Sequence, residues 1–295
     1  YDELLKLKTK GVKYSRKYYS DGSIKYNKIK KLKKLNENVN KTIITDNQEN
    51  NMKFLLISDL HFGNEFENLG LIDRAYNYCI KNGINIILCG GDFIDGSFSK
   101  SPQKITDLYD QIEYFIKNYP QDKNILTFGV AGDHDFSTLK RASLDIIEIC
   151  NNRRHDIIIG GYNNAEINIK NDKIHLFHNI LGGRMHSAQA PIILCGHLHK
   201  YMTQQKNNSL YITLPTLSNI NQQMPSALEL DVSFSKGYIS SAVIKHLYFG
   251  TQDFVLSESE FNLLNERNSN NNEIKNVEGY RQNLDAEKIL KKTNN

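Results

Sequence analysis

Five apolar runs, each followed within three residues by aspartate or histidine, constrain the fold of this chain more than any other feature of its sequence. The runs are residues 53–58, 84–89, 124–130, 173–177 and 191–195. A short continuous apolar run that ends in a polar loop is typical of a strand buried on both faces. Sites in α/β sheets assemble from loops at strand ends, so we expect the five loops to converge at one rim.

The elements between these runs indicate the fold class. Helical spacing of apolar residues predicts helices at 69–82, closed by Gly83, at 105–118 and at 141–151, so the first part reads β-α-β-α-β. After residue 151 the predicted strands follow one another closely, at 156–159, 165–169, 173–178, 191–195, 210–214, 228–232 and 239–246. Strands joined by turns favour sheet packed on sheet. We therefore predict an α/β fold, a two-sheet β-sandwich flanked by helices.

The sequence also suggests appendages around this domain. Residues 1–35 read as a helix at 2–10 and a hairpin at 12–26, with Asp21-Gly22 at its turn. A helix followed by a basic hairpin resembles the C-terminal half of a winged-helix domain. Residues 36–51 are predicted to be a linker, 52–250 the main domain and 251–295 an Asn-rich tail.

The N-terminal arm is strongly basic. Residues 1–41 hold thirteen Lys and Arg but only four Asp and Glu, within a chain of net charge +4. A basic arm beside a near-neutral body favours contact with nucleic acid. A solvated lysine-rich linker explains the same composition, and both interpretations stay open.

Cysteine usage and hydropathy bear on the compartment. The four cysteines form no CxxC pair, and Cys89 and Cys195 end apolar runs, where cysteine packs as a small hydrophobe. No run approaches the roughly 18 apolar residues of a membrane span. We expect a cytoplasmic protein without membrane contact. The chain begins at Tyr1 rather than Met, so we expect a fragment.

The loops after the five runs carry the candidate site. In chain order they supply Asp59 and His61; Asp92 and Asp95; Asp133, His134 and Asp135; His178; and His197 and His199. Carboxylates gathered at one point repel and raise one another's pKa unless cations compensate. A lone Asp-x-His could be a loop cap, but acidic and imidazole groups in all five loops favour metal ligands. The remaining histidines, His155, His175, His186 and His246, are expected at the surface or in packing.

The ligand types indicate which metals to expect. Asp and His without thiolate suit borderline or hard divalent ions, so we expect manganese, with iron, zinc or nickel as alternatives. So many ligands exceed what one ion can take, which predicts two ions sharing a carboxylate. Two ions roughly 3.5–4 Å apart can hold a phosphoryl oxygen and lower the pKa of a bridging water.

The ordered motifs resemble the calcineurin-like metallophosphoesterase superfamily over residues 52–249. The resemblance implies that Asp59, His61 and His199 bind one metal, that Asp133, His178 and His197 bind the other, and that Asp92 bridges both. It implies that His134 is the general acid toward the leaving group. It further implies that Asp135 orients His134 and that Asp95 supports the ligands from behind.

Two positions depart from the family pattern. Asp133 stands where the family usually has Asn, which removes an amide donor and adds negative charge near an anionic substrate. Asn179 follows His178 where Gly is usual, so His175 remains an alternative ligand.

These features together predict a divalent-metal phosphoesterase that hydrolyses phosphate esters, with phosphodiesters and nucleic acid as the preferred substrates. One alternative is a phosphomonoesterase or nucleotide hydrolase. Another is a nucleic-acid-binding protein whose phosphoesterase domain has degenerated, which Asp133 favours and His134 opposes.

Overall fold

The computed structural model describes residues 14–18, 24–28, 50–97, 101–179, 190–206, 208–220, 224–249 and 253–263. Two sheets dominate it, with strand orders β14-β13-β12-β3-β4-β5-β6 and β10-β11-β9-β8-β7. The larger sheet contains β3 (Asn51–Ile57), β4 (Ile86–Cys89), β5 (Leu126–Ala131), β6 (Ile157–Tyr162), β12 (Ala227–Ser235), β13 (Tyr238–Phe249) and β14 (Asp253–Asn262). The smaller sheet contains β7 (Asn164–Ile169), β8 (Asp172–Phe177), β9 (Ile192–Cys195), β10 (Met202–Lys206) and β11 (Ser209–Thr213).

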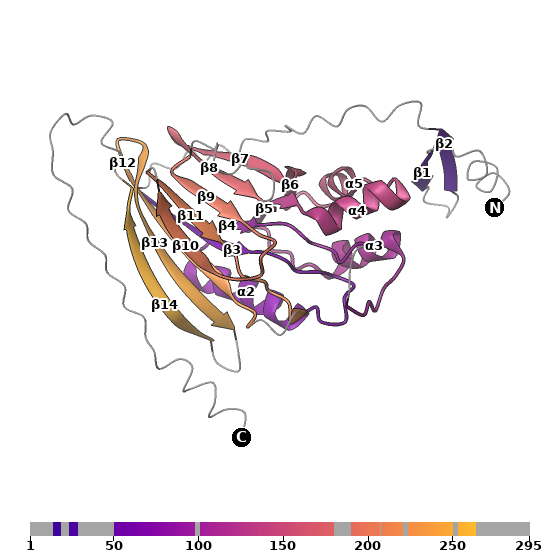
Figure 1. Ribbon diagram of the computed structural model, residues 1–295, viewed down its shortest axis with the longest axis horizontal. Helices are drawn as coiled ribbons and strands as arrows, with labels where there is room; N and C mark the ends of the chain where they lie inside the picture. The colour runs from indigo at the N-terminus through magenta and orange to yellow at the C-terminus, as the bar shows by residue number, and fades with distance from the viewer. Residues whose placement is uncertain are drawn as a thin grey trace, which may run out of the picture.

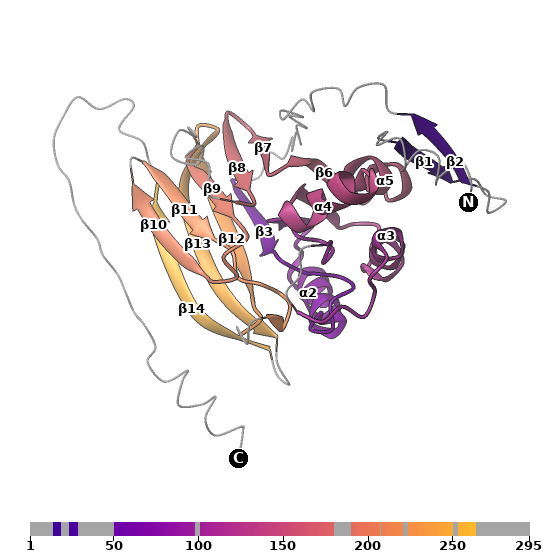
Figure 2. The ribbon, with the colours of Figure 1, turned by 45° about the vertical axis from the view of Figure 1, so that its right-hand side comes forward.

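Four helices lie on one side of the larger sheet (Figures 1 and 2): α2 (Leu69–Asn82), α3 (Leu108–Asn118), α4 (Asp133–Ala142) and α5 (Ile146–Arg153). Side chains at their starts accept from backbone N–H groups, as Asp107 does at α3 and Asp145 at α5. Gly83 ends α2 with a φ of 67°, which glycine adopts without steric cost.

The continuous apolar runs are explained by burial on both faces of the larger sheet. Along β3, Leu55 and Ile57 pack toward the helices. Phe54 and Leu56, which alternate with them, pack into the layer between the sheets. The predicted two-sheet sandwich flanked by helices is confirmed.

Strand direction places the loops that carry the candidate site. β3, β4, β5 and β6 pair in parallel, whereas β12 pairs antiparallel with β3 and β13. In the smaller sheet β8, β9 and β11 pair in parallel. The C-terminal ends of β3, β4 and β5 therefore lie along one edge of their sheet, and those of β8 and β9 lie along one edge of theirs.

Three elements differ from the prediction. Helix α4 begins at Asp133, in a stretch that the sequence suggested was a loop, and a separate helix α5 follows it. Strands β10 and β14 were not expected, and β14 lies within the predicted tail, where it pairs along β13. Both are edge strands rich in polar residues, so they lack the apolar run that marks a buried strand.

The N-terminal hairpin is present. β1 (Tyr14–Tyr18) pairs antiparallel with β2 (Ile24–Lys28). The predicted helix at 2–10, most of the linker, His186 and the tail after residue 263 lie outside the described residues. Within the described residues no helix is long and apolar enough to cross a membrane.

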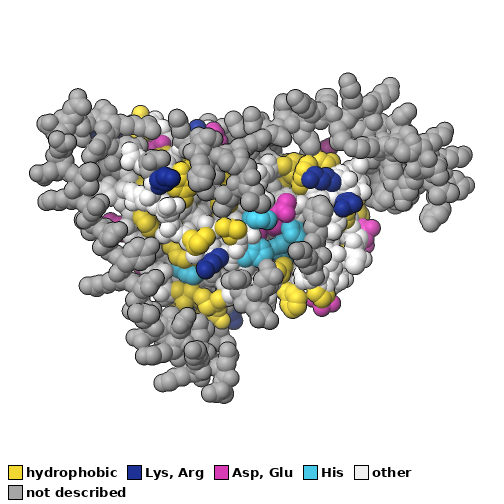
Figure 3. Space-filling model, in the orientation of Figure 1, with side chains coloured by type: hydrophobic (Ala, Val, Ile, Leu, Met, Phe, Trp, Pro, Cys, Tyr) yellow, Lys and Arg dark blue, Asp and Glu magenta, His cyan; other side chains and the backbone are white. Residues whose placement is uncertain are grey.

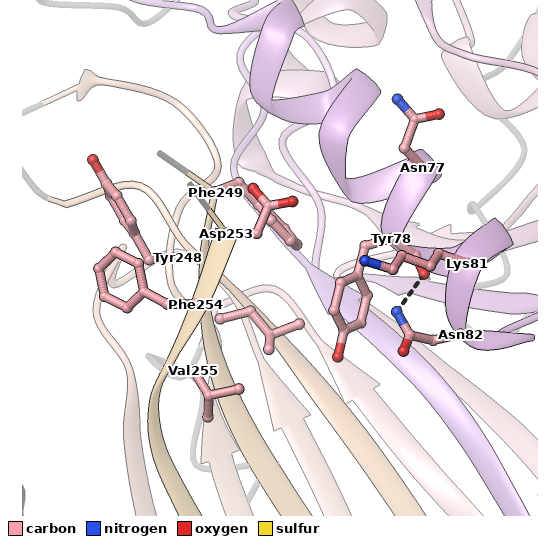
Figure 4. A pocket seen from close by; sticks show the side chains of 10 residues that line it. Asn77, Tyr78, Lys81, Asn82, Tyr248, Phe249, Asp253, Phe254 and Val255 are labelled. Carbon is pink, nitrogen blue, oxygen red and sulfur yellow. Dashed lines mark hydrogen bonds between the residues drawn. The ribbon is translucent and has the colours of Figure 1, made fainter. Parts of the chain in front are cut away.

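A cavity of about 240 Å³ opens between α2 and the β13–β14 hairpin. Figure 4 shows Tyr78 and Lys81 of α2 facing Phe249 and Val255 across it. None of the candidate ligands lines this cavity, so it is separate from the rim where they gather.

Candidate metal centre

The loops at the ends of five strands bring the candidate ligands together. Among the described residues they form three groups whose ligand atoms lie within 4.8 Å of one another. One of these, His61, Asp92 and His134, draws its first two members from the other two groups. The first ligand group is Asp59, His61 and His199, and the second ligand group is Asp92, Asp133, His178 and His197. Both sheets contribute to each group, because the three histidines His178, His197 and His199 follow β8 and β9 of the smaller sheet. Figure 3 shows histidine side chains clustered at the surface beside acidic side chains.

The backbone of these loops is in an unusual conformation. Asp59, His61, Asp92, His197 and His199 all have φ between 50° and 69°. Non-glycine residues rarely adopt this left-handed conformation, although Asp and His tolerate it better than most. Residues held in sparsely populated conformations cluster at functional sites. This observation supports a functional rim independently of the sequence motifs.

Backbone hydrogen bonds hold the first loop against the second. The N–H groups of Leu60 and His61 both donate to the Asp92 carbonyl, at 2.9 and 3.0 Å. Gly132 is required where the third loop approaches, because a Cβ there would lie 2.0 Å from Asp92 Oδ1. The loops are therefore fixed by protein contacts.

In the second ligand group the side-chain atoms point at a common centre. His178 Nε2 lies 2.9 Å from Asp133 Oδ1 and 3.1 Å from Asp92 Oδ2, and His197 Nδ1 lies 3.1 Å from Asp133 Oδ1. Ligands about 2.1 Å from one ion lie about 3.0 Å apart in octahedral coordination and about 3.4 Å apart in tetrahedral coordination. The spacing of these atoms fits a bound divalent ion.

The first ligand group contains polar atoms whose hydrogen-bonding capacity is unused. His199 Nε2 lies 3.2 Å from Asp59 Oδ1 and 3.4 Å from His61 Nε2. Asp59 Oδ1 is buried, yet it accepts no hydrogen bond from the described residues. A buried carboxylate oxygen without a donor is costly, and a cation would remove that cost. The residues present therefore fit a metal ion here too.

Asp92 lies between the two groups. Its Oδ2 is 3.1 Å from His178 Nε2 of the second group and 3.9 Å from His61 Nε2 of the first. Its Oδ1 accepts from the backbone N–H of His134 at 3.0 Å, which fixes the carboxylate in place. This position is the one that a bridging ligand would occupy.

Charges of opposite sign shift the pKa values of Asp59 and His178. Burial would raise the pKa of Asp59, but the neighbouring histidines, led by His199, lower it below its ordinary value. Burial would lower the pKa of His178, yet Asp92 and Asp133 raise it well above its usual range. The protein part of the site is thus a compact set of mutually compensating charges.

His134 lies beside the two groups and is oriented by Asp95. Its Nδ1 lies 2.5 Å from the backbone carbonyl of Asp95, and its ring packs edge-on against His61 with 4.7 Å between centroids. Burial would lower its pKa, but the charge of Asp92 and the Asp95 carbonyl raise it above the ordinary value.

In the described part of the chain, the hydrogen bonds of the Asp135 carboxylate go to backbone N–H groups and not to the His134 ring, so its predicted role in orienting His134 stays a prediction. The Asp135 carboxylate accepts from the backbone N–H groups of Phe93, Ile94 and Gly132, at 3.1, 3.0 and 2.8 Å. Burial, followed by the charge of Asp92, raises the pKa of Asp135 to about 7 although these N–H groups oppose the rise. Asp135 therefore ties the second loop to the third through three backbone donors.

Asp95 contacts both neighbouring histidines. Its carbonyl faces His134, and its Oδ1 lies 3.3 Å from His61 Nδ1. Asn64 Nδ2 donates to Asp95 Oδ1 at 3.0 Å, and Gln103 Nε2 donates to Asp95 Oδ2 at 2.5 Å. Neither Asn64 nor Gln103 belongs to a motif, so neither was predicted from the sequence.

The other described histidines belong to neither ligand group, and the cysteines that end the apolar runs pack in the core. His175, the alternative to His178, hydrogen-bonds Glu166 instead. His246 bonds the Ser226 hydroxyl at 2.8 Å, and His155 is exposed. Cys89 and Cys195 are buried, as expected of packing residues.

The fold has known counterparts. An archaeal phosphodiesterase aligns at 16% identity and a TM-score of 0.44, over 70% of this chain and 100% of its own. Vacuolar protein sorting 29 from Cryptosporidium parvum aligns at 17% identity and a TM-score of 0.46, over 72% and 100%. The phosphoesterase Yfce from E. coli aligns at 14% identity and a TM-score of 0.46, over 70% and 98%.

These overlays are partial, and a search of curated proteins finds no match. The family is decided by the sequence of the domain itself. Residues 52–233, more than half of the chain, match the model of the calcineurin-like phosphoesterase superfamily domain. The matched range includes both ligand groups, His134 and Asp95. The chain therefore belongs to the calcineurin-like phosphoesterase superfamily.

Proposed function

We propose that this protein is a two-metal phosphoesterase that hydrolyses phosphodiesters, with nucleic acid among its substrates. The position of Asp92 carries the proposal, because its carboxylate lies between two ligand groups that each fit a cation. Membership of a phosphoesterase superfamily supports the reaction class.

The two ligand groups would hold the ions. One ion would be held by Asp59, His61 and His199. The other would be held by Asp133, His178 and His197, and Asp92 would hold both. Bound there, two divalent ions supply a Lewis acid for a phosphoryl oxygen and lower the pKa of water. Manganese suits this mixture of oxygen and imidazole ligands, as do iron, zinc and nickel.

His134 is suited to donate the proton that the leaving group requires. Its Nδ1 is engaged by the Asp95 carbonyl, which leaves Nε2 as the atom that can meet substrate. Its side chain is 19% exposed, whereas His178 is fully buried. The Asp92 charge and the Asp95 carbonyl raise the pKa of His134, which favours the protonated form that a general acid requires.

Nucleic acid is proposed as a substrate because of the basic arm. The thirteen Lys and Arg of residues 1–41 could contact phosphates, and the β1–β2 hairpin offers a compact element for doing so. Binding through phosphates releases counterions, so log affinity falls by about 0.9 per contact for each unit of log salt. If about a third of these side chains bind at once, the slope is roughly −4.

A substrate panel tests the reaction. Manganese-loaded protein is assayed against a bis-nitrophenyl phosphate diester, a nitrophenyl phosphate monoester, and single- and double-stranded DNA, with Asp92→Asn as the inactive control. We expect metal-dependent hydrolysis of the diester above that of the monoester. A faster monoester would indicate a phosphomonoesterase, and the absence of hydrolysis in fully loaded protein would refute the enzymatic proposal.

A truncation tests the arm separately. Deleting residues 1–45 should abolish salt-dependent duplex binding and leave hydrolysis of the small diester intact, because all candidate ligands lie at or after Asp59. Equal affinity and equal salt slope in both forms would mean that the arm is a solvated linker.

A nucleic-acid-binding protein without turnover is the second candidate, and Asp133 favours it. A carboxylate in place of the usual Asn adds negative charge where an anionic substrate would bind. Such a protein would bind DNA and metals while failing every arm of the substrate panel.

A further inference from the structure

Asp133 differs from the other ligand carboxylates in its exposure to solvent. Its side chain is 43% exposed, whereas those of Asp59 and Asp92 are at most 1% exposed. It is also the first residue of α4, so its charge lies at the positive end of that helix. A substrate that approaches the second ligand group from solvent therefore meets the Asp133 carboxylate.

Cationic side chains do not offset this charge. In the described part of the chain, every ion-pair partner of Asp59, Asp92 and Asp133 is a histidine. With the histidines neutral as ligands, three carboxylates carry three negative charges, and two divalent ions carry four positive ones. Counted over these ligands and ions alone, one net positive charge remains for the substrate, and Asn at position 133 would leave two.

The charge of the substrate then decides how well it fits. A phosphodiester carries one negative charge, which neutralises the site. A phosphomonoester is close to a dianion above its second pKa of about 6, so it leaves the site negative. Like charges a few ångströms apart in a partly desolvated site repel strongly enough to matter in binding.

We propose that Asp133 makes this site select monoanionic phosphodiesters over dianionic phosphomonoesters. The inference rests on the proposed two-metal site and names the substrate class that it accepts. The selecting group is the carboxylate charge, because Asn at the same position keeps an oxygen for His178 and His197 and loses only that charge.

Binding without turnover tests the proposal. Calorimetry on manganese-loaded protein compares phenylphosphonate, a dianion above neutral pH, with its monomethyl ester, a monoanion of similar size. We expect the wild-type protein to bind the monoanion at least as tightly as the dianion. Asp133→Asn should strengthen dianion binding by about tenfold or more and change monoanion binding much less.

Two further variants separate charge from structure. Asp133→Glu keeps the charge and should keep the preference for the monoanion. Asp110→Asn removes a carboxylate from the first turn of α3 and should change neither affinity, because Asp110 is outside both ligand groups. Metal content measured on each sample ensures that equally loaded proteins are compared.

The outcomes distinguish this inference from the proposed function. Equal changes for both ligands in Asp133→Asn, or loss of the preference in Asp133→Glu, would overturn the role of the charge. Failure of loaded wild-type protein to bind either phosphonate would overturn it as well. Selective binding of the monoanion with no hydrolysis of either ester class would uphold the inference and refute the proposed enzymatic function.

Discussion

The two ligand groups use similar residues in different surroundings. In the first, Asp59, His61 and His199 are 0%, 2% and 12% exposed. In the second, Asp133 and His197 are 43% and 30% exposed, although His178 is fully buried. Burial fixes side chains and excludes competing water, so we expect the first group to hold its ion more tightly and the second to exchange its ion and meet the substrate.

Asp92→Asn should have the largest effect on metal content and activity, because it changes the side chain that lies between the two ligand groups. Because Asp92 lies between them, both ions should be lost together, and activity should fall by more than the 10–100-fold that loss of a supporting contact typically costs. Metal analysis of the purified variant measures this directly. Wild-type stoichiometry would show that Asp92 does not bridge.

His134→Asn should leave both groups loaded and still slow the reaction. General acid catalysis contributes about 10²–10⁴-fold, so the rate should fall by that factor for substrates with poor leaving groups. Nitrophenolate needs little protonation, so its esters should lose least. An equal loss for good and poor leaving groups, or a loss of metal, would contradict the role as acid.

Asp59→Asn and His197→Asn compare the groups one ligand at a time. Asp59 is buried, and its Oδ1 makes no hydrogen bond with the described residues although His199 Nε2 lies 3.2 Å away. Its variant should therefore weaken the tighter ion by at least about 10–100-fold, which is what loss of a supporting residue costs. His197 is partly exposed, and water can replace it, so its variant should cost about tenfold or less. Competition with a coloured chelator measures the metal affinity of the two variants and so ranks them. The reverse order would mean that burial does not set affinity here.

Gln103→Ala should have the smallest effect and should be confined to the first group. Gln103 reaches His61 only through Asp95, so the tighter ion should weaken by up to about tenfold while the other is unchanged. Gln204→Ala on the exposed strand β10 is the matched control. Equal weakening of both ions would point to a general loosening of the rim.

The sequence predicts which residues meet at the rim better than it predicts the residues that support them. Leu55 and Leu56 face opposite cores, so the runs that precede the ligands are apolar throughout and mark buried strands. Asp95 and Asp135 belong to the motifs, yet only the structure shows which of them contacts His134. Asn64 and Gln103 lie 39 positions apart and meet at Asp95 through loop geometry that no local pattern encodes.

The missed elements have physical reasons too. Gly132 and the acidic residues after it were interpreted as a ligand loop, but Asp135 in the first turn stabilises the start of α4 by accepting the N–H of Gly132. The pairing of β14 with β13 shifts register between His246 and Leu247. β14 is an edge strand with exposed acidic residues. Its sequence therefore resembles that of a polar tail.

The contribution of both sheets to each ligand group has a consequence for durability. An ion held by Asp59, which follows β3, and His199, which follows β9, would be a crosslink between the two sheets. Ligand binding to the native state alone stabilises it by about 2.7 kcal/mol at a hundredfold excess over Kd. A chelator should therefore lower the melting temperature and expose the loops between the layers to protease before it affects the helices.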